Sequence, residues 1–231
     1  MRRLLPEPAL SGADPFVEYG DAPGLRVGMV MSADGSVTDA EGWTDGLGGA
    51  ADFRVFRTLR ALADAILVGA GTVRTGRLGP ARLRPDLRAR RGGPPAPIVV
   101  VSRSLDLDWT LPLFTEAETP TVVVTTERAR ARVPSGIRTV AAGGDDIDLR
   151  EAVGLLHAEL GPRLLCEGGP GLTTALLRAS LVDELCLNIA PALHGPRTPL
   201  LTELPAEIPV EPAALYLDEG VLFVRYRVAR V

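Results

Sequence analysis

Short apolar runs alternate along the chain with segments whose apolar residues recur every three or four positions. Short apolar runs of this kind are typical of strands that are buried on both faces of a parallel sheet. Strands are predicted at 25–31, 65–68, 98–101, 122–124, 137–141, 164–166 and 184–190. Helical spacing gives one apolar face to 50–63, 152–160 and 170–177. The pattern therefore predicts a three-layer α/β domain in which strands and helices alternate.

The two ends of the chain and one internal segment depart from this alternation. Residues 213–217 and 221–228 are predicted strands joined by Asp-Glu-Gly, so a C-terminal antiparallel hairpin should complete a mostly parallel mixed sheet. Residues 1–24 are rich in Pro, Gly and acidic groups without any period, and they are predicted to form an irregular N-terminal arm. Residues 25–231 are predicted to form a single domain. Segment 74–97 consists mostly of Arg, Gly, Pro and Leu and is predicted to be a mobile loop.

Four predicted strands end in glycines or small polar residues. These ends are Gly69-Ala70-Gly71-Thr72, Ser102-Arg103-Ser104, Thr125-Thr126 and Glu167-Gly168-Gly169. The carboxyl ends of parallel strands lie along one edge of a sheet, where open α/β folds bind their ligands. Together they predict a groove for a long ligand that carries phosphates.

The segment 163–177, RLLCEGGPGLTTALL, combines a strand, a glycine turn and a helix that begins at Pro170. The free N–H groups of a helix start favour an anion such as a pyrophosphate, and Gly168 and Gly169 permit close approach. Glu167 is the only charged group at this strand end. The alternative, an ordinary strand-to-helix connection, explains these residues equally well.

A dinucleotide fingerprint is only partly present. Residues 69–74 contain two of its three glycines, and no acidic residue follows the next strand. Arg103 stands there between two serines, which suits a 2′-phosphate and favours NADPH over NADH. A solvated surface arginine is the alternative.

Composition excludes several other functions. The 231 residues carry a net charge of −4, so no overall positive field is available to bind a nucleic acid. All 25 basic residues are Arg, which removes a phosphate-loop lysine and a Schiff-base lysine. Cys166 and Cys186 lie in apolar runs without a histidine pattern, so reduced core residues and no metal site are expected. The N-terminus lacks a long apolar segment, which predicts a cytoplasmic protein without a membrane anchor.

Five segments carry a resemblance to a known family. They are MSADGSVTD (31–39), LADAILVGAGTVR (62–74), PIVVVSRS (97–104), LLCEGGPGLTTALL (164–177) and LVDELCLNIAPALHG (181–195). In this order and spacing the chain resembles the reductase domain of riboflavin biosynthesis over 25–228. The resemblance implies a dihydrofolate-reductase-like fold, NADPH as cofactor and a homodimer. It also implies reduction of the ribosyl side chain of 5-amino-6-(5-phosphoribosylamino)uracil to the ribityl amine.

The resemblance assigns roles to individual residues. The cofactor-binding set is Gly69, Gly71, Thr72, Ser102, Arg103, Gly168, Gly169 and Leu172, with Ser102 and Arg103 at the 2′-phosphate. The turn beside nicotinamide and substrate matches Ala33 and Asp34. Hydride transfer is the cofactor's own reaction, so the protein needs to supply alignment and a polar group, for which Asp34 and Glu167 are the catalytic candidates. The alternatives are a turn-forming Asp34 and a Glu167 that serves only as an acid at a helix start. Trp43, by its position after the first strand, is predicted to cover the flat ring of the substrate; a packing tryptophan is the alternative.

Departures from the family pattern leave the substrate open. Ser36 stands where the family has Lys or Arg, and 74–80 reads RTGRLGP instead of a run that begins Asp-Asn-Pro. A dihydrofolate or pterin reductase, or an NADPH-binding protein without turnover, therefore remain alternatives. The deaminase pattern of many relatives, His-x-Glu followed by Pro-Cys-x-x-Cys, does not occur, so at most the reduction step is expected.

Overall fold

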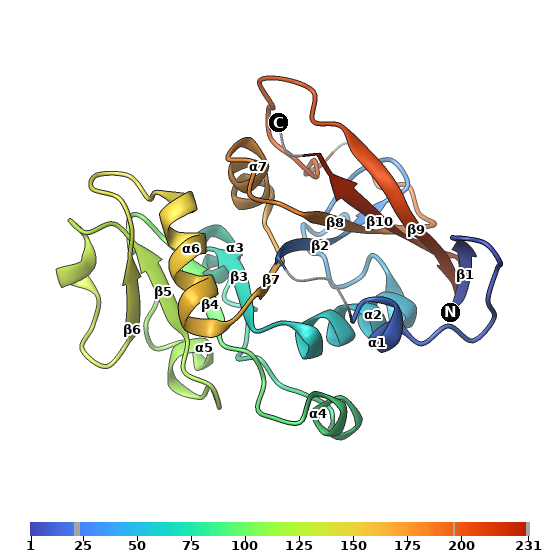
Figure 1. Cartoon of the computed structure of the whole chain (residues 1–231). Helices are drawn as coiled ribbons and strands as arrows, with labels where there is room; N and C mark the ends of the chain where they lie inside the picture. Colours follow the sequence, from blue (N-terminus) through green and yellow to red (C-terminus); the bar gives the residue numbers. More distant parts are fainter. Residues whose placement is uncertain (21–23, 196, 230–231) are drawn as a thin grey trace.

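The computed structural model describes residues 1–20, 24–195 and 197–229, and its strands form a single sheet in the order β1-β9-β10-β8-β2-β7-β3-β4-β5-β6 (Figure 1). The strands in chain order are β1 (Arg2–Leu5), β2 (Gly24–Ser32), β3 (Ala65–Gly69), β4 (Ile98–Val101), β5 (Val122–Thr125), β6 (Arg138–Ala141), β7 (Arg163–Cys166), β8 (Glu184–Ala190), β9 (Val210–Asp218) and β10 (Val221–Val228). From β8 to β6 every neighbouring pair is parallel. Strands β9 and β10 form the predicted antiparallel hairpin, and the predicted mixed α/β sheet is confirmed.

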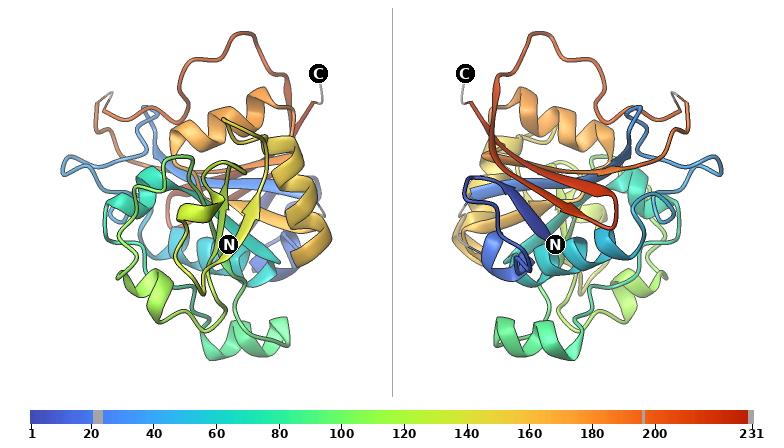
Figure 2. Two further views of the ribbon diagram at one scale, coloured as in Figure 1. Left: turned by 90° about the vertical axis from the view of Figure 1, so that its left-hand side faces the viewer. Right: turned by 90° about the vertical axis from the view of Figure 1, so that its right-hand side faces the viewer.

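Helices cover both faces of the sheet. The helices are α1 (Pro15–Glu18), α2 (Gly49–Leu62), α3 (Ala70–Arg74), α4 (Pro85–Arg91), α5 (Pro112–Thr115), α6 (Leu149–Leu160) and α7 (Pro170–Arg178), with a 3₁₀ turn at Arg130–Arg132. Both views of Figure 2 show α7 and α4 on opposite sides of the sheet. The arrangement has three layers, as the alternating pattern requires.

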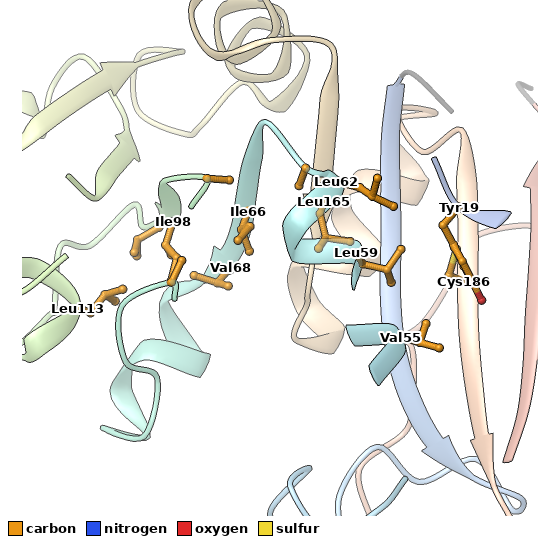
Figure 3. Close-up of a cluster of buried hydrophobic side chains, with 14 of the residues drawn as sticks. Tyr19, Val55, Leu59, Leu62, Ile66, Val68, Ile98, Leu113, Leu165 and Cys186 are labelled. Atoms are coloured by element: carbon orange, nitrogen blue, oxygen red, sulfur yellow. The ribbon is translucent and has the colours of Figure 1, made fainter. Parts of the chain in front are cut away.

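Strand alternation divides the core into two clusters. Ile66 and Val68 of β3 pack with Leu59 of α2 on one face (Figure 3), whereas Ala65 and Leu67 belong to the cluster that contains α6 and α7. These four of the five β3 residues are at most 1% exposed. A strand that is buried on both faces reads as a continuous apolar run, which is why β3 could be found from the sequence.

Two expectations about local structure were wrong. The predicted loop 74–97 contains α4, which begins at Pro85 and ends before Gly92 in the left-handed region with φ 74°. Its arginines mask the short helical period, although proline at the start and glycine at the end mark a helix. The predicted irregular arm contributes β1, which pairs with β9 at the sheet edge, and the single-turn helix α1.

None of the helices among the described residues is long and apolar enough to cross a membrane.

Candidate active site at the carboxyl edge of the sheet

A cavity of about 490 Å³ opens where β3 and β7 end. Its wall contains predicted residues from three separate segments: Gly69, Gly71 and Thr72, then Glu167, Gly169 and Leu172, and also Trp43. The parallel neighbours β7, β3 and β4 carry their polar ends to the same edge, as predicted. The prediction that separate strand ends converge on one cavity therefore holds for β3 and β7.

The two glycine turns are joined to each other by the backbone. The N–H of Gly69 donates to the carbonyl of Gly168 over 2.8 Å. Gly168 has φ +89°, and a Cβ there would lie 3.2 Å from Cε of Met29, so this position requires glycine. At Gly71 a Cβ would meet nothing within 4 Å, because this residue faces the open cavity. The turns thus present backbone rather than side chains to a ligand.

Helix α7 begins at the cavity wall. Gly169 precedes it without a side-chain cap, and Pro170 has no N–H to donate. Gly171 and Leu172 follow in the first turn, where N–H groups lack an intrahelical partner, and both line the cavity. An anionic group such as a phosphate finds backbone donors and the favourable end of the helix dipole there.

Glu167 is held in the cavity wall by an arginine of α2 that lies 107 positions away in the sequence. Both carboxylate oxygens of Glu167 accept from Arg60 of α2, Oε1 from Nε and Oε2 from Nη2, at 2.6 Å each. The side chains of Arg60 and Glu167 are only 14% and 8% exposed, and the guanidinium lies 4.4 Å from the ring centroid of Phe56. Burial alone would lower the pKa of Arg60, but the charge and hydrogen bonds of Glu167 raise it overall. Because both oxygens of Glu167 already accept hydrogen bonds from Arg60, the pair holds the Glu167 side chain in one position.

Asp34 and Ala33 do not line the cavity and are exposed. The Asp34 carboxylate accepts from the Ser32 hydroxyl and from the backbone N–H groups of His194 and Gly195, the last at 2.7 Å. The hydrogen bond from Ser32, followed by that from His194, lowers the pKa of Asp34. These contacts tie the turn after β2 to the segment after β8, so the geometry favours the turn-forming alternative for Asp34.

Ser102 and Arg103 also lie outside the cavity wall. The Ser102 hydroxyl is buried and accepts from the Leu105 N–H at 3.1 Å. Arg103 is exposed and forms an ion pair with Asp146. Sequence spacing located their strand end correctly but gave no information on these local partners.

Two loops face each other at the mouth of the cavity, one that carries Trp43 and Asp45 and one that carries Arg77. The Arg77 guanidinium lies 3.4 Å from the ring centroid of Trp43, and it pairs with Asp45 at 3.7 Å. Asp39 fixes the loop that carries Trp43 by accepting from the Trp43 N–H at 2.7 Å. Arg77 belongs to the 74–80 run that departs from the family pattern, so this departure lies at the cavity mouth.

A smaller pocket of about 100 Å³ adjoins the cavity. Met29, Thr44, Phe56 and Glu167 line both spaces. Its remaining walls are Gly28, Val30, Asp52, Leu59 and Asn188. Sequence reasoning missed Asp52, although an acid followed by the apolar residues of a helix was a visible signal.

No cluster of three or more His, Cys, Asp or Glu that could hold a metal ion occurs among the described residues. Cys166 and Cys186 are free and buried, and burial raises the pKa of Cys166 to about 12. A thiol of this kind is an inert core residue.

Comparison with known proteins identifies the family. Residues 23–212 match the RibD C-terminal domain. The 2,5-diamino-6-ribosylamino-4(3H)-pyrimidinone 5′-phosphate reductase of Methanothermobacter thermautotrophicus is 32% identical over 181 residues, which are 76% of this chain and 81% of that protein. The reductase of the same name from Archaeoglobus fulgidus is 30% identical over 184 residues, which are 76% of this chain and 83% of that protein.

Solved structures agree with this match. A pyrimidine reductase-like protein from Corynebacterium diphtheriae is 28% identical with a TM-score of 0.76, over 96% of this chain and 97% of that one. RibD of Acinetobacter baumannii, at 19% identity and a TM-score of 0.74, shares the fold over 90% of this chain and 58% of that one. The resemblance found in the sequence and the oxidoreductase class it implied are confirmed: the chain belongs to the RibD C-terminal domain family.

Proposed function

We propose that this protein is an NADPH-dependent pyrimidine reductase that transfers a hydride to the ribosyl carbon of a 6-ribosylaminopyrimidine 5′-phosphate. The observation that carries the proposal is the 490 Å³ cavity, in which two glycine turns of neighbouring parallel strands meet the Arg60–Glu167 pair. The names of the relatives from Methanothermobacter and Archaeoglobus support the substrate class.

The residues of the cavity suit a nicotinamide dinucleotide. Gly69, Gly71 and Thr72 supply one side-chain-poor wall, and Gly169 with Leu172 supplies the N-terminal turn of α7 for a phosphate. The bound cofactor would supply the hydride. The chain's task is to exclude water and to hold the donor and acceptor carbons in line. The two glycine turns can do this because the hydrogen bond from Gly69 to Gly168 joins them into one rigid wall.

NADPH is proposed over NADH because Arg103 stands at the end of β4, the neighbour of β3. Its present partner Asp146 is exposed, and exposed ion pairs contribute only about 0–1 kcal/mol. A 2′-phosphate carries more charge than one carboxylate and can take the place of Asp146 at the guanidinium.

The reaction consumes one hydride and one proton. The hydride forms a new C–H bond at the ribosyl carbon bonded to the amine, the bond from that carbon to the ring oxygen breaks, and the oxygen takes the proton. In this proposal Glu167 positions the reacting end of the substrate through Arg60 and Phe56, which share the cavity wall. Of the two arginines that line the cavity, Arg77 at the mouth is the more exposed one, and in this proposal it binds the 5′-phosphate.

The test is turnover of purified protein followed by the loss of absorbance of the reduced nicotinamide. The panel contains 2,5-diamino-6-ribosylamino-4(3H)-pyrimidinone 5′-phosphate, 5-amino-6-(5-phosphoribosylamino)uracil and dihydrofolate. We expect oxidation of NADPH with at least one of the phosphorylated pyrimidines and not with dihydrofolate. Tight binding of NADPH without oxidation by either pyrimidine would overturn the proposal and favour a binding protein.

A further inference from the structure

The 100 Å³ pocket beside the main cavity, here called the side pocket, contains an acid that the proposed reaction has not used. Asp52 lies in the first turn of α2, and Asn188 lies on β8. The two residues are 136 positions apart in the sequence, yet Nδ2 of Asn188 donates to Oδ1 of Asp52 at 2.6 Å. Both side chains are buried, at 9% and 5% exposure.

Helix capping does not explain why Asp52 is buried. An acid in the first turn gains from the helix dipole while it remains in water, and it then avoids the cost of desolvation. Asp52 accepts no hydrogen bond from the N–H groups at the start of α2 within the described residues, and burial raises its pKa in spite of the bond from Asn188. Its orientation toward the pocket therefore needs another reason.

The pair leaves one buried acceptor without a donor. Oδ1 of Asn188 is buried and has no hydrogen-bond partner in the part of the chain that the structure describes. Oδ2 of Asp52, whose other oxygen accepts from Asn188, accepts from none of the described residues. Buried acceptors are almost always satisfied in folded proteins, and an orphan commonly marks the place of a ligand or an ordered water. At one end of the side pocket, Asn188 Oδ1 and the Asp52 carboxylate are therefore hydrogen-bond acceptors that a ligand can reach.

We propose that Asp52 and Asn188 bind the edge of a 2-amino-4-oxopyrimidine ring that carries the 2-amino group and N3–H, and so select a diaminopyrimidinone over the corresponding aminouracil. This inference rests on the proposed function, whose substrate class it narrows.

The hydrogen-bonding pattern of the ring decides the selection. A 2-amino-4(3H)-pyrimidinone presents two adjacent donors, the amino group and N3–H, which match the two oxygens of a carboxylate. A uracil has a carbonyl oxygen in place of the amino group, so its lone pairs would face those of Asp52. A site built around a polar contact discriminates strongly against an analogue that cannot make it.

The size and the surroundings of the side pocket agree with this. A volume of about 100 Å³ equals roughly three water molecules at about 30 Å³ each, the scale of one pyrimidine ring. Phe56 and Met29 supply apolar surface for the ring. Because Glu167 lines both spaces, a substituent on the ring passes Glu167 and enters the main cavity, where the glycine turns lie.

The first experiment compares kcat/KM for the two phosphorylated pyrimidines in the wild type and in Asp52→Asn. The substitution keeps an oxygen that accepts from Asn188 but replaces Oδ2 with a donor. We expect kcat/KM for the diaminopyrimidinone to fall roughly 10- to 100-fold and that for the aminouracil to change by less than about threefold. Asp106→Asn, at a carboxyl that is 81% exposed, is the matched control and should change neither. Equal losses for both substrates, or no loss, would refute the inference.

A second experiment measures binding without turnover. Isocytosine and uracil, the two bare rings, are titrated into the protein by calorimetry in the absence of cofactor. We expect the wild type to bind isocytosine at least about tenfold more tightly than uracil, and Asp52→Asn to lose this preference. Equal affinity of the wild type for isocytosine and uracil would refute the inference. If the preference is found but neither phosphorylated pyrimidine is turned over, the proposed function fails and the side pocket's selectivity stands.

Discussion

Replacing Glu167 with Gln removes one charge from a buried pair and leaves Arg60 without a carboxylate. The two side chains are 8% and 14% exposed and meet through two bonds of 2.6 Å, so solvent can reach the lost partner's place only from the cavity. Removing one member of a buried ion pair costs about 3–5 kcal/mol, and the adjoining cavity admits water, which places this case near about 3 kcal/mol. For a chain of this size that corresponds to a loss of about 6 to 12 °C in Tm.

The assay is thermal unfolding of Glu167→Gln, Arg60→Met and the double variant. Methionine keeps the apolar stem that lies beside Phe56, and the double variant no longer contains a buried unpaired charge. We expect the double variant to recover most of the lost Tm while its turnover remains low, because the pair also holds the cavity wall. A fall of less than about 2 °C in Glu167→Gln, or strictly additive losses in the double variant, would show that the pair is not coupled as the geometry requires.

Four further variants test other parts of the site. Arg103→Ala should weaken NADPH binding roughly tenfold and leave NADH unchanged, as measured by fluorescence titration, and equal effects on both cofactors would exclude Arg103 as the 2′-phosphate contact. Gly168→Ala should lower the free energy of unfolding in urea by about 1–3 kcal/mol, because φ at this position is +89°. Gly71→Ala should leave stability nearly unchanged but weaken cofactor binding, since its new methyl group projects into the cavity. Burial raises the pKa of Asp52 above its ordinary 3.8, outweighing the bond from Asn188, so the folded state binds more protons than the unfolded state just above that pH. Stability should therefore fall as the pH rises through the folded pKa, and Asp52→Asn should lack this component; identical pH profiles of the free energy of unfolding would contradict it.

Several features of the fold followed from local patterns alone. Continuous apolar runs identified β3, β4 and β5, because strands that are buried on both faces leave no polar position. Helix α4 was missed because arginines fill its exposed faces, and only Leu87 is buried. Gly69, Gly71 and Thr72, which lie close together in one strand-end turn of the sequence, line the cavity, and their role in cofactor binding stays a prediction.

The sequence by itself determined the order of strands β2 to β10 and of the helices α2, α6 and α7, the glycine turns at the strand ends and the absence of lysine chemistry. Only the tertiary structure decided which charges meet: Arg60 reaches Glu167 across 107 positions, and Asn188 reaches Asp52 across 136. It also decided that Asp34 accepts from the backbone N–H of Gly195 and that Arg103 pairs with Asp146. The physical reason is that periodicity reports only how much of each face is buried. The partner of a polar side chain depends instead on sheet order and helix placement, which bring distant segments together.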